Sequence, residues 1–102
     1  MSMYIRDANG DPQKEPDTIA WAKWFEGGDD MRRVAWDESG PSVVSTVFLG
    51  IDHAFHGGPP LLWETMVFGG PLDMEQQRYT SQEAALEGHR EMVEAVKKAA
   101  GL

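Results

Sequence analysis

The sequence predicts an α+β fold: a mostly antiparallel sheet of about four strands, with a short N-terminal helix and a longer C-terminal helix packed on it. Three observations lead to this prediction. Residues 42–51 and 61–70 have the β-branched and aromatic composition of strands. Residues 79–102 repeat apolar side chains at helical spacing. The segments between them are rich in the Gly, Pro, Asn and Asp residues that form turns.

The N-terminal third is predicted to form one strand and one helix. Residues 1–6 fit a short strand, and the Asn-Gly and Asp-Pro dipeptides after it predict a loop. A helix is expected over residues 17–28, because the side chain of Asp17 or Thr18 can accept from the free amides of its first turn. Its apolar residues are too many for one narrow stripe, so we expect burial on more than one side. The two glycines at its end predict a left-handed stop, in which a glycine with positive φ ends the helix.

The centre of the chain is predicted to form three strands. Residues 34–38 are a possible strand, and residues 39–42 a turn. The strand over residues 42–51 is largely apolar on both faces, so we place it centrally, covered on each side or partly so. It should pair with residues 61–70 as a hairpin. Residues 70–78 read as a polar turn.

The last helix carries its own start signal and a buried face. Thr80 and Glu83 have the spacing of a capping box, in which each side chain satisfies a free backbone amide. Gly88 costs about 1 kcal/mol relative to alanine inside a helix, so we expect it to allow close packing on the sheet. The predicted buried face consists of Ala85, His89, Met92, Val93 and Val96.

Size and composition limit the classes of protein to consider. A chain of 102 residues forms a single domain, residues 1–102. Its net charge of −8 argues against nucleic-acid binding through phosphate neutralisation, and is most simply a solubility feature. The absence of cysteine excludes disulfides, zinc–cysteine sites and thiol nucleophiles. There is no apolar run of the length that a signal peptide or membrane span needs, so we expect a soluble, cytoplasmic protein.

The segment IDHAFHGGPP, residues 51–60, raises the question of a metal site. Asp52, His53 and His56 have side chains that can bind a metal ion, but a metal site needs three or four ligands. Glu64 or His89 would have to complete the set, and the spacing of the sequence places neither of them near the other three. We therefore expect a turn, with no metal and no cofactor. In that turn Asp52 bonds nearby amides, and the two glycines adopt positive backbone angles.

Two further titratable residues have a functional and a structural interpretation. Glu64 shares its predicted strand face with apolar residues, where a carboxylate is costly unless it is paired. It is either a general acid or base, or it lies on a partly exposed face, or it pairs with Arg33, Arg78 or the Thr46 hydroxyl. On the last helix, His89 is more simply a packed histidine bonded to a backbone group.

Four tryptophans are many for this length, and those that are exposed are good anchors for a protein partner. They are Trp21, Trp24, Trp36 and Trp63.

The segment VSTVFLGIDHAFHGGPPLLWETMVFGG, followed by RYTSQEAALEGHREMVEAV, resembles a family of small uncharacterised proteins of bacteriophages and prophages, notably of actinobacteria. The N-terminal segments YIRDANGDP, WAKWFE and RRVAWDE are similar to that family too. The resemblance implies a phage origin and expression in the cytoplasm of a bacterial host. It implies no reaction and no catalytic residue.

The sequence favours a non-enzymatic protein-interaction module that binds a host or phage protein, or its own copy, and modulates a host function or defence. The alternative is a small-molecule or nucleotide binder, or a minimal hydrolase, that uses Asp52, His53, His56 and Glu64. Mimicry of DNA is less favoured, because the carboxylates are scattered along the chain. The candidate binding residues are Asp52, His53, His56, Trp63 and Glu64.

Overall fold

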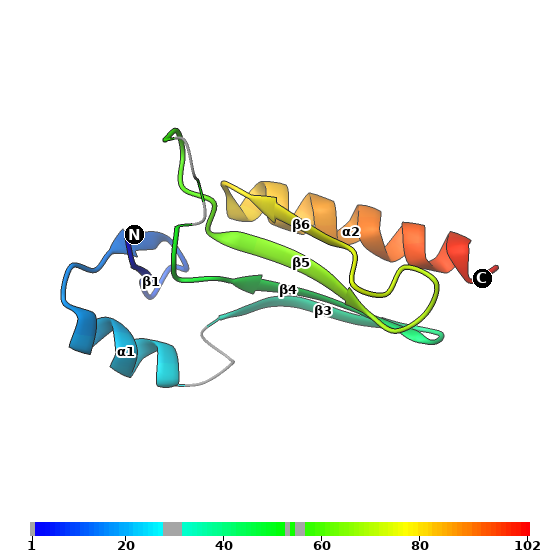
Figure 1. Ribbon diagram of the computed structural model, residues 1–102, viewed down its shortest axis with the longest axis horizontal. Coiled ribbons are helices and arrows are strands. Elements are labelled where there is room, and N and C mark those ends of the chain that lie inside the picture. Colours follow the sequence, from blue (N-terminus) through cyan, green and yellow to red (C-terminus); the bar gives the residue numbers. More distant parts are fainter. Residues whose placement is uncertain (1, 28–31, 53, 55–56) are drawn as a thin grey trace.

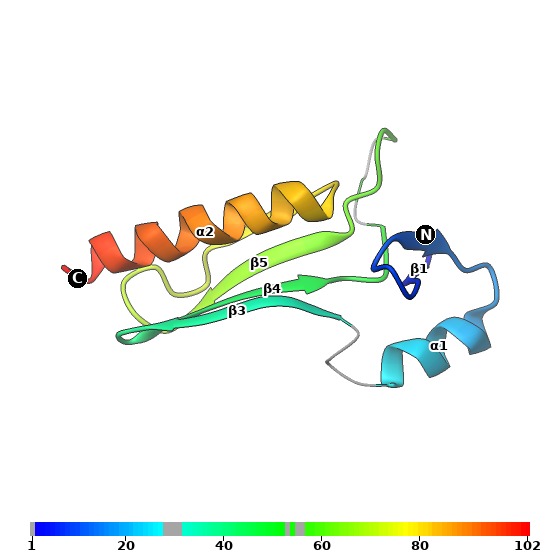
Figure 2. The ribbon, with the colours of Figure 1, turned by 180° about the vertical axis from the view of Figure 1, so that it is seen from behind.

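The computed structural model of the chain describes residues 2–27, 32–52, 54 and 57–102. Strands β3 to β6 form one antiparallel sheet in the order β3-β4-β5-β6, and helix α2 lies along one face of it (Figures 1 and 2). This arrangement confirms the predicted α+β class. The elements are β1 (Tyr4–Arg6), β2 (Pro12–Lys14), α1 (Thr18–Glu26), β3 (Arg33–Ser39), β4 (Ser42–Phe48), β5 (Trp63–Phe68), β6 (Gln76–Tyr79) and α2 (Gln82–Ala99).

The predicted hairpin of the two apolar strands is confirmed. β4 pairs with β5 in a register that runs from Val43 opposite Phe68 to Phe48 opposite Trp63. Because β3 pairs with the other edge of β4, β4 is a central strand, as its composition predicts. Just beyond this register, the Leu49 amide donates to the Leu62 carbonyl at 2.7 Å, so the two segments stay paired one step past the strands.

Two strands occur where the sequence predicts loops. Gln76–Tyr79 lies in a segment predicted to be a turn, yet it pairs with β5 as the edge strand β6. Pro12–Lys14 pairs with β1 in a separate two-stranded sheet, so the N-terminal strand does not belong to the main sheet. Both added strands are polar. An edge strand gains its hydrogen bonds from the backbone and needs no apolar alternation, so composition does not mark it.

The core lies between α2 and the sheet, in two apolar clusters with a polar centre. Thr46, Thr65 and His89 form this centre, and all three are buried. The predicted face of α2 is the face that packs on the sheet: Ala85, His89 and Val96 are buried, and Met92 and Val93 are partly buried against the second cluster. The first cluster contains Phe48, Leu62, Trp63, Tyr79 and Ala85; the second contains Val44, Val67 and Val96.

The helix ends agree only partly with prediction. Asp17 caps α1 as expected, accepting from the amides of Ile19 and Ala20. The predicted capping box of Thr80 and Glu83 is wrong: α2 begins one residue later, where the Ser81 hydroxyl accepts from the Ala84 amide at 3.1 Å. The left-handed stop is also wrong for Gly27, whose φ is −65°.

Gly28, the other glycine of the expected stop, lies outside the described residues. Gly27 still closes a turn, because its amide donates to the Trp24 carbonyl at 3.1 Å. The negative φ of Gly27 does not itself require glycine, although a Cβ atom there would lie 3.1 Å from the Trp24 carbonyl oxygen.

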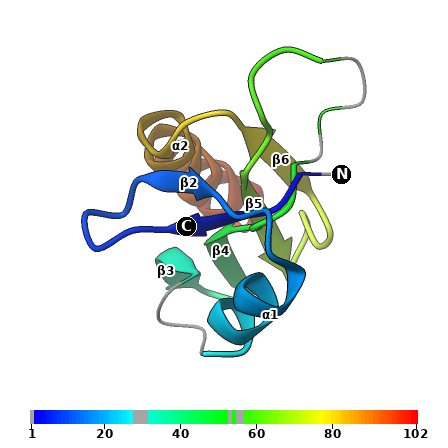
Figure 3. The same cartoon turned by 90° about the vertical axis from the view of Figure 1, so that its left-hand side faces the viewer.

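Helix α1 lies beyond one end of the sheet, displaced to the side away from α2 (Figures 1 and 3). The Trp24 ring meets Phe48 edge to face at 5.8 Å, and Trp21 Nε1 donates to the carbonyls of Tyr4 and Gly50. None of the residues Thr18–Glu26, all of which the structure describes, is fully buried. The expected burial on more than one side is therefore wrong, because α1 covers the end of the sheet and not a face.

Candidate functional site: the open face of the sheet

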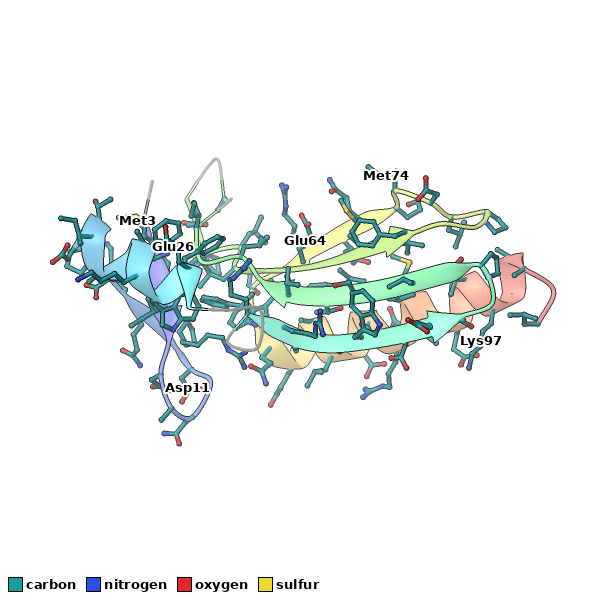
Figure 4. The ribbon with its side chains drawn as sticks, turned by 90° about the horizontal axis from the view of Figure 1, so that it is seen from below. Met3, Asp11, Glu26, Glu64, Met74 and Lys97 are labelled. Atoms are coloured by element: carbon teal, nitrogen blue, oxygen red, sulfur yellow. The ribbon has the colours of Figure 1, made fainter. Side chains whose placement is uncertain are left out.

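The face of the sheet opposite α2 carries no covering element among the described residues (Figure 4). We call this surface the open face. Strand alternation places on it the residues that point away from α2, since Asp37, Thr46 and Thr65 point toward α2. The open face consists of Arg33, Trp36, Glu38, Val43, Ser45, Val47, Glu64, Met66, Phe68, Gln76 and Arg78.

Two large apolar side chains on the open face are well exposed. The exposed fractions of Trp36 and Phe68 are 44% and 46%. Val43, Val47 and Met66 lie between or beside them on the same face and are partly buried. An exposed apolar patch edged by polar residues is typical of a surface that binds another protein. Tryptophan and large apolar residues are also the side chains that contribute most to such binding.

Three of the four charged residues of the open face contact a neighbour on that face. Arg78 Nε donates to Glu64 Oε2 at 2.9 Å, across the registered pair of β5 and β6. Arg33 stacks over the Trp36 ring, with its guanidinium carbon 4.7 Å from the ring centre. These contacts place Arg33, Glu64 and Arg78 beside the apolar patch.

The polar centre of the core is a chain of hydrogen bonds that links four elements. His89 on α2 lies 2.7 Å from the Thr46 hydroxyl through Nδ1, and 2.7 Å from Asp37 Oδ2 through Nε2. The Thr46 and Thr65 hydroxyls are 2.5 Å apart. His89 therefore bonds side chains and not a backbone group, which corrects the prediction for this residue.

A hydroxyl, an imidazole and a carboxylate in a row invite comparison with a nucleophilic triad. Here the hydroxyl is at the buried end, because the exposed fraction of Thr46 is 0%. The exposed end is the Asp37 carboxylate, beside a shallow cavity of about 320 Å³ that His89, Arg90, Val93 and Glu94 also line. A nucleophile has to reach the substrate, so this geometry supports a structural role for the chain of hydrogen bonds.

The structure shows Asp52 as the residue that holds its turn together. Asp52 Oδ1 accepts from the amides of Ala54 at 2.8 Å and Leu61 at 3.0 Å. Gly57 and Gly58 have φ of +79° and +83°, as expected for this turn. His53 and His56 lie outside the described residues. Among the described residues, no three His, Asp or Glu side chains are grouped so that they could hold a metal ion.

Trp63 and Glu64 are neighbours in sequence that point to opposite faces of the sheet. Trp63 is buried in the first apolar cluster, under α2. It also lines a cavity of about 320 Å³ between the β1–β2 turn and the start of α2, with Asp11 and Glu83 among the other lining residues. Glu64 lies on the open face, where Figure 4 shows it on the near side of the sheet. It is paired with Arg78, which is one of the partners that the sequence suggests for it.

The sequence indicates Trp36 as one of four possible anchors, and it draws attention to Thr46 and His89, but it singles out neither Phe68, Asp37 nor Thr65. Trp36 and Phe68 are the exposed anchors, and Asp37, Thr46 and Thr65 form the polar centre with His89. One signal was present: the alternation of residues 43–48 gives two apolar faces, while only one long helix follows to cover them.

In comparisons with known proteins, no family model, no curated protein and no solved structure matches the chain. Neither helix in the described part of the chain combines the length and apolar character that crossing a membrane requires.

Proposed function

We propose that this chain is a non-enzymatic protein-interaction module that binds its partner protein through the open face. The observation that carries the proposal is the exposure of Trp36 and Phe68 on a sheet face that no described element covers. In a small protein, side chains of this size are normally buried in the core. Leaving two of them on one face, beside charged side chains, favours a binding role.

The polar centre of the core supports this proposal. His89 and Thr46 are the residues whose chemistry most suggests catalysis, and both are buried and bonded to each other. Their hydrogen bonds join α2 to β3, β4 and β5, so they hold the sheet in shape under the open face. A rigid scaffold reduces the entropy lost when a partner binds.

The resemblance to phage proteins gives the setting that we propose for this binding. We propose that the chain acts in the cytoplasm of a bacterial host, where its partner is a host protein or a protein of the phage itself. In that setting, the binding serves to modulate a host function or defence.

The proposal is tested by affinity capture from lysates of bacteria that express a tagged and an untagged form of the chain together. The face variants are Trp36→Ser and Phe68→Ser, and the matched control is Leu86→Ser, an exposed leucine on α2. We expect at least one protein, the untagged copy included, to be retained by the wild type and the control and lost by both face variants. Identical retention by all four forms, or no retention by any, contradicts the proposal.

A further inference from the structure

We propose that the open face binds a second copy of this chain, face to face about a two-fold axis. This inference rests on the proposed function, because it names the partner that the open face takes. The observations that carry it are the charge balance of the face, the order of its charges along β3, and its size.

The open face is balanced in charge, whereas the whole chain is strongly acidic. The net charge of the chain is −8. The face carries two cations, Arg33 and Arg78, and two anions, Glu38 and Glu64, so its own sum is zero and the excess of carboxylates lies elsewhere. Two copies therefore meet with the least repulsion when these faces join. A strongly basic partner would find its complement elsewhere on the surface.

The order of the charges selects one two-fold axis. Strand register puts Arg33, Glu64 and Arg78 in one row across the sheet, Trp36 and Met66 in the middle row, and Glu38 and Phe68 in the third row. An axis along the strands would set Arg33 of one copy against Arg78 of the other, which repel each other. An axis across the strands, through the row of Trp36, sets Glu38 of each copy against Arg33 of the other. The second arrangement makes two ion pairs, brings Trp36 and Met66 of the two copies together, and sets each Phe68 beside the Glu64–Arg78 pair of the other copy.

The size of the face predicts a weak dimer. Four strands about 4.8 Å apart, with about six residues rising roughly 3.3 Å each, give a flat area of roughly 400 Å². Two such faces bury less than the ~1,200–2,000 Å² of a stable interface. Helix α1 projects on the same side of the sheet, beyond its end, so it extends the surface that a second copy meets (Figures 1 and 2). We therefore expect a dissociation constant in the range of tens of micromolar, on the order of 10⁻⁵ M.

Sedimentation equilibrium of the purified full chain, from about 5 to 500 µM, tests the inference across the expected dissociation constant. We expect a monomer–dimer equilibrium over this range of concentration. Trp36→Ser and Phe68→Ser should each weaken the dimer about tenfold or more, and Leu86→Ser should leave it within about twofold. A monomer at all concentrations, or a dimer that the two face variants do not weaken, overturns the inference.

A charge exchange tests the axis and does not depend on removing apolar residues. Arg33→Glu and Glu38→Arg should each weaken the dimer several-fold, by about three- to tenfold. The double variant, Arg33→Glu with Glu38→Arg, should restore it, because the two opposed pairs form again with their signs exchanged. A double variant as weak as the single ones contradicts this axis. Circular dichroism of every variant establishes that it is folded before its dimer is measured.

The two proposals fail in different ways. If the purified chain is a monomer while capture from cells depends on Trp36 and Phe68, the second copy is excluded as the partner and the binding function stands. If neither measurement depends on these two residues, both proposals are wrong.

Discussion

At the scale of single residues, the most constrained part of the molecule is the hydrogen-bonded chain in its core. Thr46 has two side-chain partners, the Thr65 hydroxyl and His89 Nδ1, whereas Thr65 is joined to the chain through Thr46. A buried polar atom that loses its partner costs about 1–3 kcal/mol, more than the same bond contributes when it is intact. The two threonines therefore differ in importance, although each has an exposed fraction of 0%.

We expect Thr46→Val to lower the free energy of unfolding by about 2–4 kcal/mol, because the methyl group leaves two buried partners unsatisfied. Thr65→Val should lower it by about 1–2 kcal/mol, because Thr46 keeps its bond to His89. Urea denaturation of the two variants provides the comparison. Equal losses for the two variants would show that Thr46 does not join the two bonds in solution.

Gly88 is a second residue whose role depends on one neighbour. A Cβ atom at this position would overlap the Tyr79 side chain, which packs in the first apolar cluster. In an exposed helix position, glycine to alanine gains about 1 kcal/mol. At Gly88, the overlap forces Tyr79 or the helix to shift, and overpacking of this kind costs about 1–3 kcal/mol.

We therefore expect Gly88→Ala to destabilise the protein in thermal unfolding, in spite of its better helix propensity. Glu91→Ala, at an exposed position of α2, is the matched control and should change stability by less than about 0.5 kcal/mol. A rise in the melting temperature of Gly88→Ala would show that the helix does not approach the sheet this closely.

At the scale of elements, the sequence predicts those segments whose pattern matches the layer on which they pack. Residues 42–48 alternate between two apolar faces, and the structure places them as the central strand β4. The buried face of α2 is likewise correct from helical spacing alone. β2 and β6 have no such pattern, because their pairing depends on backbone bonds to an edge that exists only once β1 and β5 are placed.

The candidate site, like the fold, can be predicted from the sequence only where a local pattern marks it. Alternation of side chains could have placed Trp36 and Phe68 on the same face as Glu64. It could not show that this face stays open, because that depends on where α1 packs. The position of α1 is set by contacts between residues far apart in the sequence, such as Trp24 with Phe48. Such contacts have no local signature.

The β1–β2 hairpin depends on one carboxylate, which makes its stability sensitive to acid. Asp7 Oδ1 accepts from the amides of Asp11 and Asn9, and its Oδ2 accepts from the Gln13 side chain. The hydrogen bond from the Asp11 amide is the largest cause that lowers the pKa of Asp7 below its ordinary value. A lowered pKa in the folded state means that ionised Asp7 stabilises the turn above its ordinary pKa of about 3.9.

This contribution is lost as pH falls through the lower, folded-state pKa. We expect the backbone amide resonance of Asn9 and the side-chain amide resonances of Gln13 to shift during an acid titration, with a midpoint below that of an unstructured aspartate, about 3.9. Asp7→Asn removes the charge, so the same amides should lose this transition. A midpoint above the ordinary value in the wild type would contradict the sign of the shift.

At the scale of the whole molecule, the chain is longer than a compact domain of its size. Its radius of gyration is 14.5 Å, whereas about 13 Å is typical of a domain of some 100 residues. The extra length comes from α1 and the β1–β2 hairpin, which continue beyond the end of the main sheet (Figures 1 and 2). None of the residues of α1 is fully buried, while β4, β5 and α2 enclose both apolar clusters. We therefore infer two regions of unequal local stability.

We expect hydrogen exchange of the wild type to be at least about tenfold faster for the amides of α1 and β1 than for those of β4 and β5. Trp21→Phe should widen this difference. It keeps an aromatic ring to stack on Phe25 but removes the N–H that Trp21 donates to both Tyr4 and Gly50. Trp36→Phe, on the open face, is the control and should leave exchange in α1 unchanged. If Trp21→Phe accelerates exchange in β5 as much as in α1, the chain opens as one cooperative unit, and its two ends do not differ in stability.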